Sequence, residues 1–138
     1  MSLVLDSSAT LAWIYDEEVN ASIRKVFVTI KESGAWVPSL WPLEVGNVLE
    51  MGVRRGRHDV AFRDAALVDL ALLPVTLDLH TSRHAWGTTL RLAEHHRLTL
   101  YDAAYLELAK RINLPLATLD KDLSLAARTE GVIVLGQN

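Results

Sequence analysis

Residues 99–123 read TLYDAAYLELAKRINLPLATLDKDL, and this stretch predicts a helix, a tight connection, a short buried strand and the start of another helix. Thr99 precedes the first helix with the spacing of a capping box, in which the third residue on is Asp102. The helix is expected to end at Asn113 and Pro115, because Asn tolerates left-handed backbone and Pro disfavours helical geometry in the residue before it. The stretch therefore predicts the alternation of helix and strand that is typical of an α/β protein.

Two predicted strand ends carry the same group, a carboxylate at the start of the following helix. The apolar run 114–119 has the length of a strand buried on both faces, and Asp120 follows it. A second apolar strand, predicted at Ser2–Leu5, is followed in the same way by Asp6. Ligands bind at the carboxyl ends of the strands in an open parallel sheet. If both strands lie in one sheet, the two acids are neighbours and candidates for a shared site.

The rest of the chain continues the alternation of strands and helices. Short strands are predicted at 35–37, 75–77 and 132–135. Helices are predicted at 17–32, 39–51, 60–73, 81–96 and 123–129. The helix at 81–96 is expected to turn Trp86, Leu90 and Ala93 inward. This order predicts a three-layer α/β/α sandwich with a central, mostly parallel sheet.

Length and composition limit the class of protein. The 138 residues suffice for a single domain, residues 1–138, with a core of its own. The absence of cysteine excludes a disulfide scaffold, a thiolate zinc site and a cysteine nucleophile, and it fits a reducing cytoplasm. The amino terminus has no basic segment before an apolar core, and no run reaches the roughly 18 apolar residues of a membrane span. We therefore expect a cytoplasmic protein without a membrane segment.

Charge and apolar content bear on partners. The formal net charge is −3, so binding to nucleic acid has to rest on a local basic patch. The run Arg54–Arg57 is such a patch, and it either complements the end of a helix or contacts phosphate. Apolar residues make up 50% of the chain, which indicates that a partner covers part of the surface.

Four acids share one kind of position, the start of a predicted helix: Asp6, Glu44, Asp102 and Asp120. Capping and the helix dipole explain any one of them alone, at about 0.3 to 1 kcal/mol each. Together they are costly, because two unit charges about 4 Å apart repel by roughly 4 kcal/mol near a protein surface. A cation has to offset this repulsion, and carboxylates without Cys or His at ligand spacing select Mg²⁺ or Mn²⁺. Such an ion supports phosphodiester hydrolysis.

The motifs around these acids resemble those of the PIN-domain ribonucleases, in particular the VapC toxins of bacterial toxin–antitoxin pairs. The motifs are VLDSS at 4–8, Glu44 with Asn47, YDAAYLELA at 101–109 and LATLDKDL at 116–123, so the resemblance covers the whole chain. It implies a metal-dependent endoribonuclease whose Mg²⁺ or Mn²⁺ ligands are the four acids, with Asp122 as an additional acid.

The same resemblance implies two protein partners. One is a second copy of the chain, in a homodimer. The other is a cognate antitoxin protein whose carboxyl-terminal tail covers the active-site groove. A groove lined by residues such as Leu11, Trp13 or Trp41 would account for the high apolar fraction of the sequence, whereas Trp36 and Trp86 are expected in the core.

Polar residues beside the acids have a structural and a functional interpretation. Ser7, Ser8 and Thr118 either cap helices and strand ends or hold a carboxylate in place. Asn47 lies about one helical turn after Glu44 and could brace it in the same way.

Other chemistries remain as alternatives. Paired histidines could act as acid and base without metal, but only His80 and His84 have a suitable helical spacing, and no acid completes a zinc motif there. His95 and His96 are adjacent and are expected to point different ways. A phosphohydrolase with an aspartyl intermediate would need a second acid two residues after Asp6, where a serine stands. A non-catalytic module of the same fold that binds RNA or protein is the remaining alternative.

Overall fold

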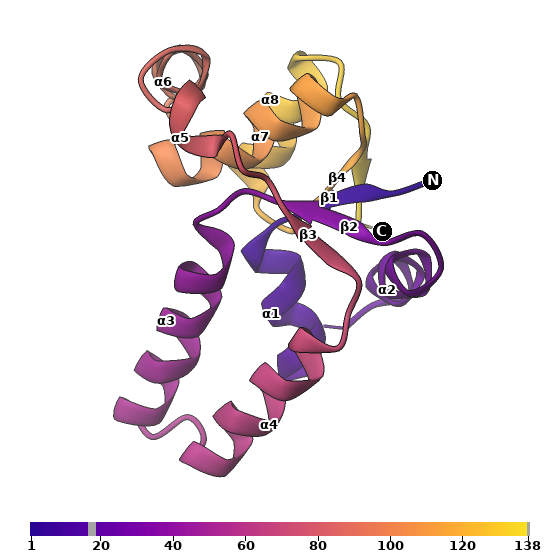
Figure 1. The fold of residues 1–138 in the computed structure, drawn as a ribbon, viewed down its shortest axis with the longest axis vertical. Coiled ribbons are helices and arrows are strands. Elements are labelled where there is room, and N and C mark those ends of the chain that lie inside the picture. The colour runs from indigo at the N-terminus through magenta and orange to yellow at the C-terminus, as the bar shows by residue number, and fades with distance from the viewer. Residues whose placement is uncertain (17–18, 138) are drawn as a thin grey trace.

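The computed structural model describes residues 1–16 and 19–137, in which a five-stranded sheet lies between two groups of helices (Figure 1). The strands are β1 (Leu3–Leu5), β2 (Ala35–Val37), β3 (Val75–Leu77), β4 (Leu116–Ala117) and β5 (Val134–Leu135). Their spatial order is β3-β2-β1-β4-β5, and every neighbouring pair is parallel. The predicted α/β/α class is therefore confirmed.

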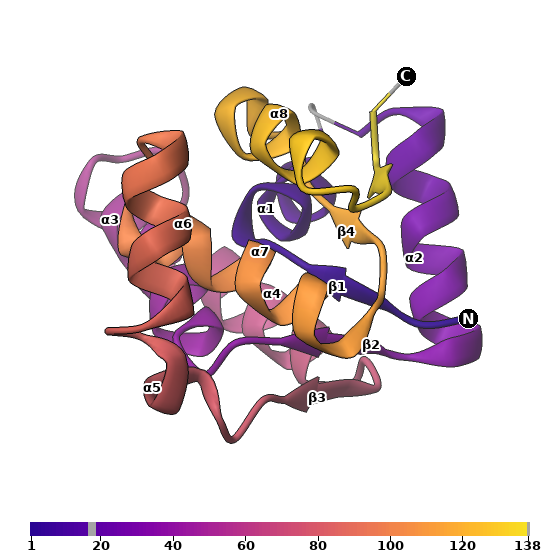
Figure 2. The same cartoon turned by 90° about the horizontal axis from the view of Figure 1, so that it is seen from above.

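Helices cover both faces of the sheet, as right-handed crossovers between parallel strands require. One side carries α1 (Ser7–Tyr15), α2 (Ala21–Ser33), α3 (Trp41–Arg54) and α4 (Val60–Ala71) (Figure 1). The other side carries α5 (Thr81–His84), α6 (Thr88–His96), α7 (Leu100–Ile112) and α8 (Lys121–Thr129). Helix α7 lies along β1, whose three side chains are fully buried (Figure 2). In the described part of the chain, no helix has the length and apolar content to cross a membrane.

Side-chain caps explain where the helices nearest the sheet edge begin. Asp6 accepts a hydrogen bond from the Ala9 backbone N–H at the start of α1, at 2.9 Å. Thr99 caps α7 as its sequence spacing predicts, by accepting from the backbone N–H of Asp102 at 3.1 Å. The same helix ends where Asn113 adopts left-handed backbone, with φ of 56°. Each of these caps fixes the position of a polar side chain at the end of a helix.

The single helix predicted at 81–96 is wrong, because the chain forms the two helices α5 and α6 instead. The backbone leaves the helical region at Gly87, with φ of −109° and ψ of −106°. As a result, Trp86 is 89% exposed and Leu90 is 47% exposed, whereas Ala93 is buried as expected. Apolar residues at helical spacing therefore do not mark a buried face in this segment.

Other element boundaries differ from the prediction by a few residues. Helix α2 begins at Ala21 and not at residue 17, because Asn20 caps it by accepting from the Ile23 N–H at 2.7 Å; residues 17 and 18 lie outside the described residues. Helix α4 ends two residues earlier, and the strands predicted at 114–119 and 132–135 shorten to β4 and β5. The strands at 35–37 and 75–77 are confirmed to the residue.

Candidate active site

The topology of the sheet singles out one position on its edge. Strands β2 and β3 lie on one side of β1, and strands β4 and β5 lie on its other side. The point between β1 and β4 is therefore the topological switch point, where ligands bind in open α/β sheets. Asp6 follows β1 and Asp120 caps the helix after β4, so both acids stand at this point. The backbone N–H of Asp6 donates to the Ala117 carbonyl at 3.1 Å, which links the two strand ends.

Asp6 is the most enclosed of the acids, with 3% of its surface exposed. Burial raises the pKa of its carboxyl from 3.8 to about 7. Hydrogen bonds from the Ala9 N–H and from the hydroxyls of Thr118 and Ser8 oppose this rise, and the nearby charge of Asp102 adds to it. A cation at this point would therefore stabilise the ionised form of Asp6.

Two hydroxyl groups join the ends of β1 and β4. The buried Thr118 donates to Asp6 Oδ2 and accepts from the backbone N–H of Asp120, the latter at 3.0 Å. Ser8 donates to both oxygens of Asp6, at 2.8 and 2.9 Å, and accepts from the backbone N–H of Leu119 at 2.9 Å. Ser8 and Thr118 thus hold Asp6, whereas Ser7 lies beside the hydroxyl of Tyr105.

Glu44 and Asp102 approach the same point from the first turns of α3 and α7. The hydroxyl of Tyr105 donates to Glu44 Oε1 at 2.7 Å, and the Tyr105 side chain is fully buried. Asp102 has a raised pKa, first because it is partly buried and then because the charges of Asp120 and Glu44 oppose its ionisation. The four acids therefore act on one another electrostatically although they belong to four separate segments.

Asp122 and Asn47 stand at the margin of this group. Asp122 is exposed in the first turn of α8, and its charge raises the pKa of Asp102 less than the charges of Asp120 and Glu44 do. Asn47 is exposed on α3. Among the described residues, Tyr105 donates the hydrogen bond to Glu44 that was expected from Asn47. Tyr105 belongs to the motif YDAAYLELA, but nothing in the sequence selected it as a partner of Glu44.

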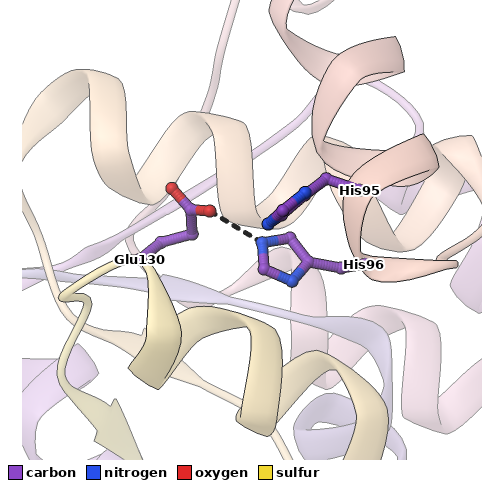
Figure 3. A group of neighbouring side chains, drawn as sticks. All are labelled: His95, His96 and Glu130. Atoms are coloured by element: carbon purple, nitrogen blue, oxygen red, sulfur yellow. Dashed lines mark hydrogen bonds and ion pairs between the residues drawn. The ribbon is translucent and has the colours of Figure 1, made fainter.

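A different set of ligand groups lies closer together than the acids do. Among the described residues, three ligand atoms within 4.8 Å of one another occur at His95, His96 and Glu130 (Figure 3). The expectation that the two histidines point different ways is wrong, because both rings face the Glu130 carboxylate. The four acids are not gathered as tightly, which is consistent with the mutual repulsion of like charges.

A cavity of about 330 Å³ opens beside Asp120. Its lining includes Ser8, Leu11, Tyr15 and Arg57. The guanidinium of Arg57 lies 3.5 Å from the centre of the Tyr15 ring, which is a cation–π contact. One residue of the basic run predicted from the sequence, Arg57, therefore lines the same cavity as Asp120. Arg54 pairs with Glu50 at 3.1 Å.

A second, more apolar groove of about 610 Å³ lies between α1 and α4, lined by Trp13, Ile14, Phe62 and Leu72 among others. The Trp13 ring stacks on Phe27 with a centroid distance of 4.5 Å. Trp41, expected to line a groove, is instead 8% exposed and donates its indole N–H to Thr10 Oγ1 at 3.0 Å. Of the three residues expected at the active-site groove, Leu11 lines the cavity beside Asp120, whereas Trp13 lines the other groove and Trp41 is buried.

Comparison with known proteins gives a consistent picture. The family model of the PIN domain matches residues 3–129. A protein of Pyrobaculum aerophilum named Ribonuclease VapC3 is 33% identical over 126 residues, which are 90% of this chain and 93% of that protein. A protein of Mycobacterium tuberculosis, also named Ribonuclease VapC3, is 38% identical over 91 residues, 64% of this chain and 62% of that protein. The crystal structure of PAE2754 from Pyrobaculum aerophilum superposes with a TM-score of 0.67 at 29% identity, covering 97% of this chain and 92% of that one.

Proposed function

Because the chain belongs to the PIN-domain family, we propose that it is a metal-dependent endoribonuclease, and that its active site is the group Asp6, Glu44, Asp102 and Asp120. The observation that carries the proposal is the electrostatic coupling of these acids at the switch point of the sheet. Helix starts in an all-parallel sheet share this edge in any case, but capping does not explain why acids that raise one another's pKa are placed together there, whereas a cation site does.

The donor set of these residues fits a hard divalent cation. All four candidate ligands are carboxylates, and the raised pKa values of Asp6 and Asp102 reflect burial together with neighbouring negative charge. Oxygen-only donors favour Mg²⁺ or Mn²⁺ over zinc. The four acids would hold the ion, with Asp122 at the margin. When bound, it supplies Lewis-acid activation of water and neutralises charge on the phosphate.

The chain's own residues have distinct roles in this proposal. Ser8 and Thr118 fix the orientation of Asp6 through their hydroxyls. Tyr105 orients Glu44 from the buried face of α7. The cavity beside Asp120 would be the place for a nucleotide next to the cleaved bond, because an aromatic ring and a guanidinium, those of Tyr15 and Arg57, line it.

We further propose that the chain is the toxin of a toxin–antitoxin pair, acting on RNA in the cytoplasm, and that it forms a homodimer. The relatives bearing the name VapC support the pairing with an antitoxin protein. The apolar groove between α1 and α4 is suited to such a partner, because large apolar side chains of its lining are exposed, among them Phe62 of α4 at 38% and Leu72 just after α4 at 79%.

Cleavage of a total-RNA pool by the purified chain tests the proposed activity. The samples are wild type, Asp102→Asn and the matched control Asp69→Asn, an exposed acid of α4, each with Mg²⁺, Mn²⁺ or EDTA. We expect Asp102→Asn and EDTA each to lower cleavage by at least about 100-fold, and Asp69→Asn to cut like wild type. Cleavage that persists in Asp102→Asn would reject the site. Binding of RNA without any cleavage would support the non-catalytic module instead.

A further inference from the structure

A second group of ligand side chains lies where the carboxyl-terminal end of α6 meets that of α8. His95 and His96 close α6, and Glu130 follows α8 (Figure 3). Asp120 and Glu130 stand at opposite ends of the nine-residue helix α8, which is about 13 Å long. This group is therefore separate from the acids of the proposed active site.

From this geometry we propose that His95, His96 and Glu130 form a binding site for a transition-metal ion of the Zn²⁺ class. Two imidazole nitrogens and one carboxylate oxygen lie within 4.8 Å of one another. This donor set is one that zinc uses when three protein ligands leave a fourth position for water. The site would differ in selectivity from the acids, because imidazole favours zinc and copper over magnesium.

The two adjacent histidines converge through their side chains. Successive residues of a helix diverge by about 100° around its axis, and both histidines belong to the last turn of α6, which ends at His96. The two rings meet edge to face, at 83° with centroids 4.6 Å apart, and both turn toward Glu130 (Figure 3). Since Zn–N bonds are about 2.0 to 2.1 Å long, the three atoms have to draw closer on binding. The exposed His95 has the room to do so.

The partners of Glu130 leave one oxygen for a metal. Lys110 donates to Oε1 at 2.5 Å, and Oε2 faces His96 Nε2 at 2.7 Å. Lys110 and then His96 lower the pKa of Glu130, so its carboxylate is ionised at neutral pH. On metal binding, the Nε2 proton of His96 leaves for solvent or for Nδ1, and the nitrogen lone pair and Oε2 turn to the metal. Lys110 would remain on Oε1 and keep the carboxylate oriented.

The alternative is an ion-pair network that joins α6, α7 and α8 without metal, and His95 separates the two interpretations. Its ring has an edge contact with His96, whereas the hydrogen bonds of Glu130 go to His96 and Lys110. In the network interpretation, His95→Ala leaves zinc binding unchanged. In the metal-site interpretation, it removes a ligand and spares the network.

Calorimetric titration of the tag-free chain with ZnCl₂ provides the test, using wild type, His95→Ala, and His80→Ala as the matched exposed histidine. We expect His95→Ala to weaken one zinc-binding event by at least about 10-fold and His80→Ala to match wild type. Zinc affinity that is equal in wild type and His95→Ala would overturn the proposal, as would the absence of zinc binding in wild type.

Copper provides a second readout that does not depend on activity. The electron paramagnetic resonance spectrum of Cu²⁺ shows nitrogen coupling when imidazoles are ligands, and the proposed active-site acids contain no nitrogen donors. We expect nitrogen coupling in wild type and in Asp102→Asn, and its reduction in His95→Ala. A spectrum with oxygen ligands only in wild type would contradict the site. Asp102→Asn thus distinguishes failure of this proposal from failure of the proposed nuclease.

Discussion

At the residue scale, Asp6 illustrates how the proposed function conflicts with stability. Its carboxyl is buried and its pKa rises to about 7, although three hydrogen-bond donors contact it. The folded chain therefore keeps a proton up to about pH 7 that the unfolded chain releases near pH 3.8. Between these values the unfolded state binds fewer protons, so stability falls as pH rises.

Replacing Asp6 by Asn should stabilise the metal-free chain while abolishing cleavage. At pH 7.5 in EDTA, we expect the free energy of unfolding to rise by about 1 to 2 kcal/mol, or roughly 3 to 8 °C in Tm. Thermal unfolding at several pH values measures this, and the gain should grow from pH 5 to pH 7. A variant that is less stable than wild type at pH 7.5 would show that Asp6 is not a strained carboxylate.

Tyr105 is the residue that we expect to position Glu44. Tyr105→Phe removes the hydroxyl that donates to Glu44 Oε1 at 2.7 Å, so kcat/KM for RNA should fall about 10-fold, with a higher Mn²⁺ requirement. The loss of stability should be about 1 kcal/mol. Tyr101→Phe is the matched control, since Tyr101 lies on the same helix and is 64% exposed. Equal activity and Mn²⁺ dependence in both variants would remove Tyr105 from the mechanism.

At the scale of elements, strands could be predicted from the sequence where turn-forming residues flank them at both ends. The strand at 35–37 lies between Gly34 and Pro38, and both of its ends are as predicted. The break between α5 and α6 could not be predicted in this way, because Trp86 and Leu90 have helical spacing but face solvent. Periodicity reports a possible apolar face, and only packing decides whether that face is covered.

A buried ion network fixes α7 against the end of β3. Arg111 donates to Asp78 Oδ2 at 2.6 Å and to Glu107 Oε2 at 2.7 Å, and each acid is 3% exposed. Arg111→Ala leaves two buried carboxylates without their cation, which should cost about 3 to 5 kcal/mol of unfolding free energy.

Urea denaturation of Arg111→Ala measures this cost. Arg24→Ala, at an exposed position of α2, is the matched control and should change stability by less than about 0.5 kcal/mol. A loss below about 1 kcal/mol in Arg111→Ala would mean that water replaces the guanidinium, and that the network does not fix α7.

At the scale of the whole molecule, the proposed site exists only because the sheet reverses its direction of growth between β1 and β4. The motifs around Asp6 and Asp120 predicted two acids on one edge, and the parallel pairing of β1 with β4 bears out that placement. The convergence of Glu44 and Asp102 could not be read from spacing, because helix starts in separate segments meet only after folding. The cluster at Glu130 escaped prediction for the same reason, since its histidines lie 34 and 35 residues earlier in the chain.

Mn²⁺ binding tests most directly whether the acids act as one site. The free Mn²⁺ signal in electron paramagnetic resonance measures the dissociation constant, and a His95→Ala background excludes any contribution from the imidazole cluster. With Asp102→Asn, we predict that affinity falls by at least about 10-fold, whereas the exposed Asp69→Asn binds like its parent. Unchanged affinity in Asp102→Asn would contradict the claim that acids from separate helices hold one ion.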